Sequence, residues 1–301
     1  MSADYNGESG ESRLINALSG LLFGYNRVKL YEKTFFTVNH AIEPFNGVLF
    51  SSSLSWQRRR MLENRLHRSW LGRAAEPNIP ENASFRSMPS NDLLKASFSL
   101  KYTPACYYRM YEGRKVYEAP RYPIFTLRYE RAFPMEGLRR PASYHLIQLS
   151  ANQEVRFGLF NRLRWQAEGG AFYDKKNFRF PDFKHFASTD IGLMERSFDV
   201  GFQLMNNYAL SADTRWAQAG LSWYTPYLLL KQLPFLSDKL FDEALHLRSA
   251  AVYGRRVYTE AGYSLGLSSI LRAGVFVGFE GSKFRSAGVS ISVPMLHSAI
   301  K

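Results

Sequence analysis

The chain has 301 residues with a formal net charge of +13, and 15% of its residues are aromatic. Its one cysteine, Cys106, excludes an intrachain disulfide and a multi-thiolate metal site. The basic residues are scattered and form no recognisable nucleic-acid module, so we expect no nucleic-acid partner. No run of about 18 apolar residues occurs, which excludes a transmembrane helix.

The N-terminal segment does not read as a signal peptide. Residues 1–13 are acidic, rich in Gly and Ser and lack a basic region, so we expect them to be disordered. A short apolar run at 14–23 follows, without a clear cleavage site.

From about residue 28 onward, apolar and small polar residues alternate in a long series of segments. A strand places successive side chains on opposite faces, so each segment predicts a strand with one apolar and one polar face. The clearest segments are 48–57, 95–102, 125–130, 162–173, 199–204, 217–223, 272–279 and 286–295, and weaker ones lie near 28–40, 144–157 and 244–257. Asn46-Gly47, between alternating runs, predicts a tight hairpin.

The polar face of these strands carries Ser, Gly, Gln and isolated Arg rather than Lys–Glu arrays. This pattern favours a hydrated interior with lipid outside. We therefore predict an all-β fold, an antiparallel transmembrane β-barrel of about twelve strands over residues 14–296, with a tail at 297–301. The residues predicted to face lipid are Leu221, Trp223, Val289, Ile291 and Val293; Ser290, Ser292, Gln218 and Ser222 should face the lumen.

Three longer connections stand out. Residues 63–92 follow the basic cluster Arg58–Arg60, which at a barrel rim would meet outer-membrane lipid or anionic glycolipid; a solvated loop face is the alternative. Residues 174–194 contain the sequence FPDFKHF, and 226–243 are apolar with two prolines, unlike a solvated loop. We expect the last segment to pack on or inside the wall, and we take Asp182, His185, Leu233, Pro234 and Phe235 as candidate functional loop residues.

No catalytic motif is present. The chain lacks a Gly-rich phosphate loop, a GxSxG elbow and paired histidines at metal-ligand spacing, so we expect no enzyme activity, cofactor or metal. Asp182 and His185 are the one suggestive acid–base pair, and a structural loop role is the alternative.

Several stretches resemble one known family. They are Lys29–Lys33, Asn46-Gly47 with Trp56–Arg59, Tyr122-Pro123 with Leu127–Glu130, Phe180–Phe186, Leu228–Phe241 and Tyr258–Glu260. Over residues 20–296 the chain resembles the C-terminal barrel region of Bacteroidetes-type outer-membrane proteins that begin with a carboxypeptidase-regulatory-like domain, a family of unknown function. It departs from the family at Ala187-Ser188-Thr189, where Asn-Gly-Asn is usual.

The resemblance implies a bacterial outer-membrane location. Such a barrel needs a signal and its early strands, so we expect this chain to be a fragment of a longer protein and an incomplete wall. We expect a role in surface transport, export or assembly, with envelope proteins as partners. A barrel enzyme acting on lipid or glycan, and a soluble β-rich ligand-binding protein, remain the alternatives.

Overall fold

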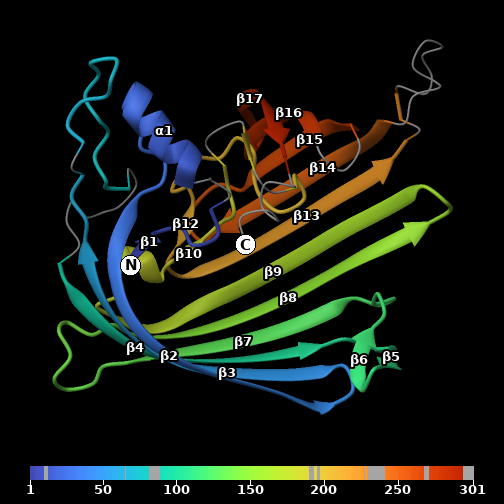
Figure 1. Cartoon of the computed structure of the whole chain (residues 1–301), viewed down its shortest axis with the longest axis horizontal. Coiled ribbons are helices and arrows are strands. Elements are labelled where there is room, and N and C mark those ends of the chain that lie inside the picture. Colours follow the sequence, from blue (N-terminus) through green and yellow to red (C-terminus); the bar gives the residue numbers. More distant parts are fainter. Residues whose placement is uncertain are drawn as a thin grey trace.

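One curved, open sheet carries most of the chain (Figure 1). The computed structural model describes residues 1–9, 13–64, 66–80, 89–189, 193–194, 197–226, 228–229, 241–267 and 271–293. The strand order is β1-β2-β3-β4-β7-β8-β9-β13-β14-β15-β16-β17-β11. The first twelve strands pair antiparallel, and β11 adds to β17 in parallel. The expected all-β antiparallel sheet of about twelve strands is therefore present.

The long strands are neighbours in sequence as well as in the sheet. Their bounds are β2 (Leu30–Phe45), β3 (Val48–Met61), β4 (Asn91–Tyr102), β7 (Ile124–Phe133), β8 (Ser143–Phe157), β9 (Asn161–Lys176), β13 (Arg215–Thr225), β14 (Phe241–Val252), β15 (Tyr258–Leu267), β16 (Leu271–Glu280) and β17 (Lys283–Ser292). Short elements complete the fold: β1 (Ser2–Asp4), α1 (Arg13–Phe23), β5 (Tyr108–Tyr111), β6 (Arg114–Tyr117), the 3-10 helix η1 (Phe180–Asp182), β10 (Lys184–His185), β11 (Leu193–Met194) and β12 (Ser211–Ala212). Among the described residues, no helix is long and apolar enough to cross a membrane.

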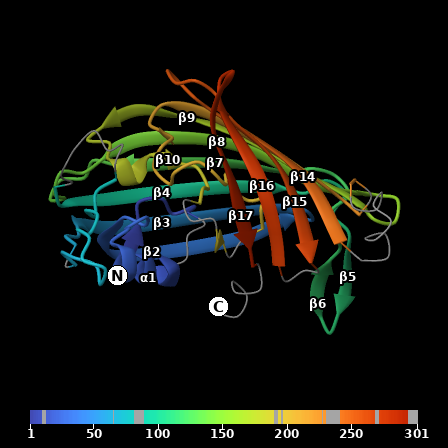
Figure 2. The same cartoon turned by 90° about the horizontal axis from the view of Figure 1, so that it is seen from above.

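The sheet bends strongly along its width. Figure 2 shows β14–β17 turned across the direction of β2–β9, so that the wall has a concave and a convex side. In the described chain, the sheet ends with β1 beyond β2 on one side and with β11 beyond β17 on the other, and these two ends do not pair with each other. The wall is thus open, and closure into a barrel is not part of this structure.

The predicted hairpin at Asn46-Gly47 is confirmed. β2 ends at Phe45 and β3 begins at Val48. Gly47 has φ +81°, and a Cβ there would lie 2.5 Å from the carbonyl oxygen of Thr103. Both the left-handed backbone and the close approach therefore require glycine.

Several expectations about local structure are wrong. Residues 199–204 form no strand: Gly201, Phe202 and Gln203 are all buried, which a two-faced strand in this wall does not permit. Residues 1–9 are not a disordered tail, since Ser2–Asp4 pair with β2 and Asn6 is fully buried. The run at 14–23 lies within α1, and the series of strands includes β15 and the β5–β6 hairpin, which the alternation did not single out.

The apolar core lies on the concave side of the wall. Leu93, Tyr144, Phe172 and Trp216 of the strands pack with Phe186 and Phe202 from the connection between β9 and β13. Small residues make room for these large ones: a Cβ on Gly170 would lie 2.5 Å from the Trp216 ring, and one on Gly262 would lie 2.1 Å from the Phe276 ring. Alternation of small and large side chains on neighbouring strands is how narrow β-walls fill their concave side.

Candidate functional site

Beyond the apolar core, the concave face of the wall is polar, and its polarity follows from strand register. Pairing aligns Ser53 of β3 with Ser97 of β4, and Ser97 in turn with Glu130 of β7. Further along the sheet, Arg164 of β9 aligns with Ser222 of β13. The period of two in each strand thus produces rows of polar side chains that run across neighbouring strands on the concave face.

A folded segment covers much of this polar surface. We call residues 177–189 and 197–214, which connect β9 to β13, the inner segment. It contains η1, β10 and β12, and it lies beside the N-terminal strand β1 on the concave side (Figure 1). The side-chain amide of Asn6 donates to the carbonyl oxygens of Phe186 and Asn207, both at 3.0 Å, so the N-terminus is tied to the inner segment.

Charged groups attach the inner segment to the wall. Arg59 of β3 donates to Asp182 at 2.6 Å, and both side chains are almost fully buried. Lys184 contacts Glu168 of β9 at 2.7 Å. Burial lowers the pKa of the Lys184 ammonium, but Glu8 and Glu168 outweigh this and raise it, so the cation persists.

A carboxylate of β15 provides a further attachment. The backbone N–H groups of Gln203 and Leu204 donate to the Glu260 carboxylate at 2.6 and 2.9 Å. The hydroxyl of Tyr258 donates to the same carboxylate at 2.8 Å. Removing one partner of a buried charged contact leaves the other unsatisfied, so each attachment resists separation of segment and wall.

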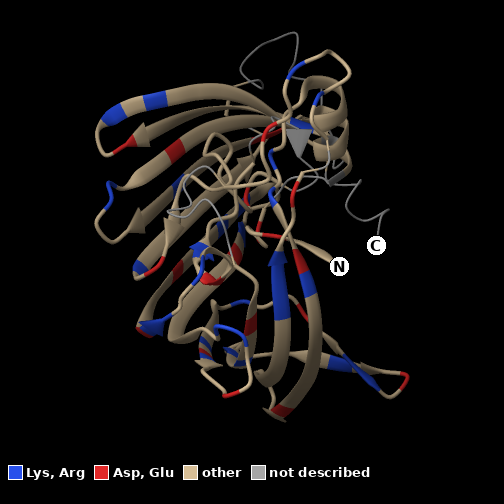
Figure 3. Cartoon of the chain, turned by 90° about the vertical axis from the view of Figure 1, so that its left-hand side faces the viewer, with Lys and Arg blue, Asp and Glu red and all other residues tan. Residues whose placement is uncertain are grey.

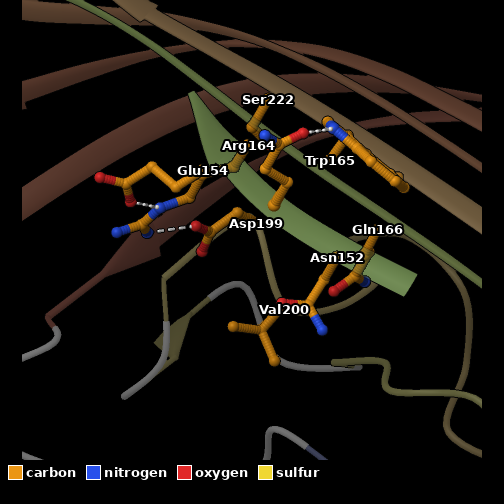
Figure 4. Close-up of a pocket in the computed structure, with 10 residues that line it drawn as sticks. Asn152, Glu154, Arg164, Trp165, Gln166, Asp199, Val200 and Ser222 are labelled. Atoms are coloured by element: carbon orange, nitrogen blue, oxygen red, sulfur yellow. Dashed lines mark hydrogen bonds and ion pairs between the residues drawn. The ribbon is translucent and has the colours of Figure 1, made fainter. Parts of the chain in front are cut away.

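A polar pocket of about 240 Å³ opens between the inner segment and the wall (Figure 4). Arg164 lies between Glu154 of β8 and Asp199 of the inner segment, with both contacts at 2.5 Å. Burial raises the pKa of the Asp199 carboxyl, but hydrogen bonds from Arg164 and Ser197 and the positive charges of Arg164 and Arg248 together outweigh burial and lower the pKa, so Asp199 stays ionised. The other polar lining residues are Asn152, Gln153, Gln166 and Ser222.

The polar space continues along the wall. A second pocket of about 320 Å³ shares Asn152, Gln166 and Val200 with the first. Together they border the inner segment with amide, hydroxyl and carboxylate groups, a lining that water would wet. Among the described residues, no three His, Cys, Asp or Glu side chains gather as a metal site would require.

Asp182 ends η1 and His185 lies in β10, and the two side chains contact different partners. Asp182 binds Arg59, whereas His185 Nδ1 is 2.9 Å from the Ser211 hydroxyl and Nε2 is 2.9 Å from the Phe180 carbonyl oxygen. Nε2 therefore carries the proton and donates, and Nδ1 accepts. Burial lowers the pKa of His185 to about 4, so the ring is neutral at pH 7. This geometry gives His185 a structural role, because neither ring nitrogen is available as a base.

The remaining predicted residues fall into two groups. Leu233, Pro234 and Phe235, with most of the segment 226–243, lie outside the described residues. Leu221, Val289 and Ile291 are exposed on the convex face, and Trp223 and Val293 are partly exposed. Ser290, Ser292 and Ser222 lie on the opposite face and are buried, and Gln218 is half-buried there.

Sequence reasoning missed the ionic attachments. It treated Arg58–Arg60 as one rim cluster, but Arg59 points to the concave side and binds Asp182, while Arg58 is on the other face with Asp92. The strand alternation already placed Arg59 on the opposite face from Arg58 and Arg60. Figure 3 shows that Lys and Arg are spread over strands and turns and do not form one block.

Two comparisons bear on identity. No curated protein matches the chain. Residues 1–265 match the family described as "Family of unknown function (DUF5686) C-terminal domain". Because this match covers most of its length, the chain belongs to the DUF5686 C-terminal domain family, whose function is unknown.

Proposed function

We propose that this chain forms the wall of a bacterial outer-membrane β-barrel, with its convex face in lipid and its concave face in a polar lumen. The observation that carries the proposal is that the exposed convex face is the apolar one, the reverse of the arrangement in a soluble sheet protein. Large apolar side chains on nearly every long strand are exposed on the convex side: Phe36, Val38, Leu54, Phe98, Leu100, Phe125, Leu127, Ile147, Leu149, Leu221, Leu245, Leu247, Val275, Val289 and Ile291.

The alternative of a soluble ligand-binding protein conflicts with this surface. Val289 is 66% exposed and Val38 is 53% exposed, and they lie on strands near opposite ends of the sheet. Soluble monomers rarely expose a continuous apolar patch larger than a few hundred Å². Lipid would cover such a face without a protein partner. The enzyme alternative gains no support from the Asp182–His185 arrangement.

Membrane insertion places a demand on the sheet edges. Backbone N–H and C=O groups cannot stay unpaired in hydrocarbon, so we expect the parts of β2 and β17 that the short strands β1 and β11 leave uncovered to be paired in the membrane. By itself, this chain should not span a bilayer stably. A purified 301-residue chain that refolds in detergent as a heat-resistant monomer would contradict that expectation.

We propose a role in surface transport, export or assembly, and in this role the inner segment has a specific part. It occupies the concave side through ion pairs, so it serves as a plug that partner contacts in the envelope could displace. In planar bilayers that hold the closed barrel, with the edge strands of this chain paired, Lys184→Gln with Asp199→Asn should raise conductance several-fold above the unmodified protein, because two attachments are lost. Arg109→Gln, in the distant β5–β6 hairpin, is the control. Equal conductance of all three proteins would refute the plug.

Site-directed labelling tests the lipid-facing assignment directly. Single cysteines would replace Leu221, Gln218 or Arg109 in a Cys106→Ser background, and membranes of cells expressing the protein would be treated with a water-soluble or a lipid-soluble maleimide. We expect Leu221→Cys to react only with the lipid-soluble reagent and Arg109→Cys to react readily with the water-soluble one. Comparable reaction of both cysteines with the water-soluble reagent would exclude a lipid-facing convex surface. Gln218→Cys should resemble Arg109→Cys, at a lower rate.

A further inference from the structure

A larger cavity lies outside the site described above. It has a volume of about 570 Å³ and is bordered by the turn between β14 and β15, the adjoining ends of β16 and β17, and residues 204–210 of the inner segment. All of its lining residues are described in the structure. Its size is in the range of small-molecule sites.

The cavity has an apolar floor. Met205, Leu210 and Tyr258 line it and are buried, and Leu204 is partly buried beside them. The Tyr258 hydroxyl is occupied by Glu260, so the face that the ring offers to the cavity is hydrocarbon. The floor would bind an alkyl or otherwise apolar group.

The mouth of the cavity is cationic. Arg255, Arg256 and Arg285 line it together with a single carboxylate, that of Glu280, which leaves a net charge of +2 among these four residues. Arg285 contacts Glu280 at 2.5 Å, and Arg255 donates to the Ala209 carbonyl oxygen at 3.0 Å. Arg256 forms no ion pair with any described residue, so its guanidinium can bind an anion without breaking a contact.

From this arrangement we propose that the cavity binds an anionic amphiphile, with a phosphate or carboxylate head between the arginines and an apolar portion on the floor. Guanidinium groups bind both oxyanions through paired hydrogen bonds. Three exposed apolar residues, Tyr253, Val257 and Phe284, are next in sequence to lining residues of the cavity. The inference concerns binding alone and does not depend on the proposed membrane wall.

Short-chain lipids provide a direct test. Binding of dihexanoyl phosphatidic acid to the full chain in neutral maltoside micelles would be measured by titration calorimetry, with empty micelles subtracted. Dihexanoyl phosphatidylcholine and inorganic phosphate serve as comparison ligands. We expect phosphatidic acid to bind at least tenfold more tightly than either, because phosphatidylcholine lacks the net negative charge and inorganic phosphate lacks the apolar portion.

Two substitutions should change affinity in opposite directions. Arg256→Gln removes a guanidinium and should weaken binding about tenfold, whereas Glu280→Gln removes the only lining carboxylate and should tighten binding several-fold. A misfolded variant would not tighten binding, so the second result is independent of any loss of structure. Arg109→Gln, an exposed arginine paired with Glu118 in the distant hairpin, should leave affinity unchanged.

The proposal fails under any of three results. Equal affinity for phosphatidylcholine would show that the arginines do not select charge. Equal affinity for inorganic phosphate would show that the floor contributes nothing, and the ligand would be a free anion. Unchanged affinity in both Arg256→Gln and Glu280→Gln would place binding elsewhere.

Discussion

Leu221 and Gln218 offer a matched comparison of the two faces of one strand. Both lie in the interior of β13, three residues apart, with Leu221 on the convex face and Gln218 on the concave face. The perturbation is the same at both positions, replacement by arginine. Leu221 is 41% exposed and Gln218 borders the pocket of about 320 Å³, so both sites have room for arginine and overpacking does not obscure the effect of charge.

The expected magnitudes differ between lipid and water. Arginine at a lipid-facing position near the midplane costs about 2–4 kcal/mol. If the convex face met water, the same change at a partly exposed site would stay within about 0.5 kcal/mol. At Gln218, a new guanidinium would lie beside Glu168, its partner in the register, so we expect a cost below about 1 kcal/mol.

Urea unfolding in neutral maltoside micelles measures both free energies. We expect Leu221→Arg to lower the free energy of unfolding by at least 2 kcal/mol more than Gln218→Arg does. Ser290 would be a poor control, because it is only 1% exposed and arginine there would overpack the concave side. Equal destabilisation by Leu221→Arg and Gln218→Arg would refute the assignment of faces.

Three further predictions follow from contacts within the wall, within the inner segment and between the two. Burial holds the pKa of His185 at about 4 in the folded chain, against about 6.5 in the unfolded chain, so unfolding takes up a proton between these two pH values. The contribution of His185 to the free energy of unfolding should therefore be full above pH 6.5 and fall by up to about 3 kcal/mol as the pH drops to 4. Denaturation at several pH values should show a weaker fall in His185→Asn, and an identical slope would exclude His185 as its source. Arg59→Met should cost about 3–5 kcal/mol by leaving Asp182 charged and unpaired, whereas Arg59→Met with Asp182→Leu should recover most of it; failure of the double variant to recover stability would show that the pair acts through more than charge. Gly262→Ala should cost about 1–3 kcal/mol through contact with Phe276, and thermal unfolding of the double variant with Phe276→Ala should show that the two costs are not additive.

The period of two in the sequence determined most of the wall. It located strands such as β9, β13 and β17 and assigned their residues to two faces, because side-chain direction in a strand depends only on sequence parity. Asn46-Gly47 determined its hairpin for an equally local reason, the left-handed backbone that glycine permits.

Tertiary structure alone decided what covers the concave face. Val200, Phe202 and Leu204 alternate like a strand, yet they lie in the inner segment, where the consecutive residues Gly201, Phe202 and Gln203 are all buried and the two-faced environment that alternation assumes is absent. The pairs Arg59–Asp182 and Arg164–Asp199 join residues 123 and 35 positions apart, and no local pattern encodes such contacts. The arginine-lined cavity likewise combines three distant segments, because its residues meet only once the wall has curved around the inner segment.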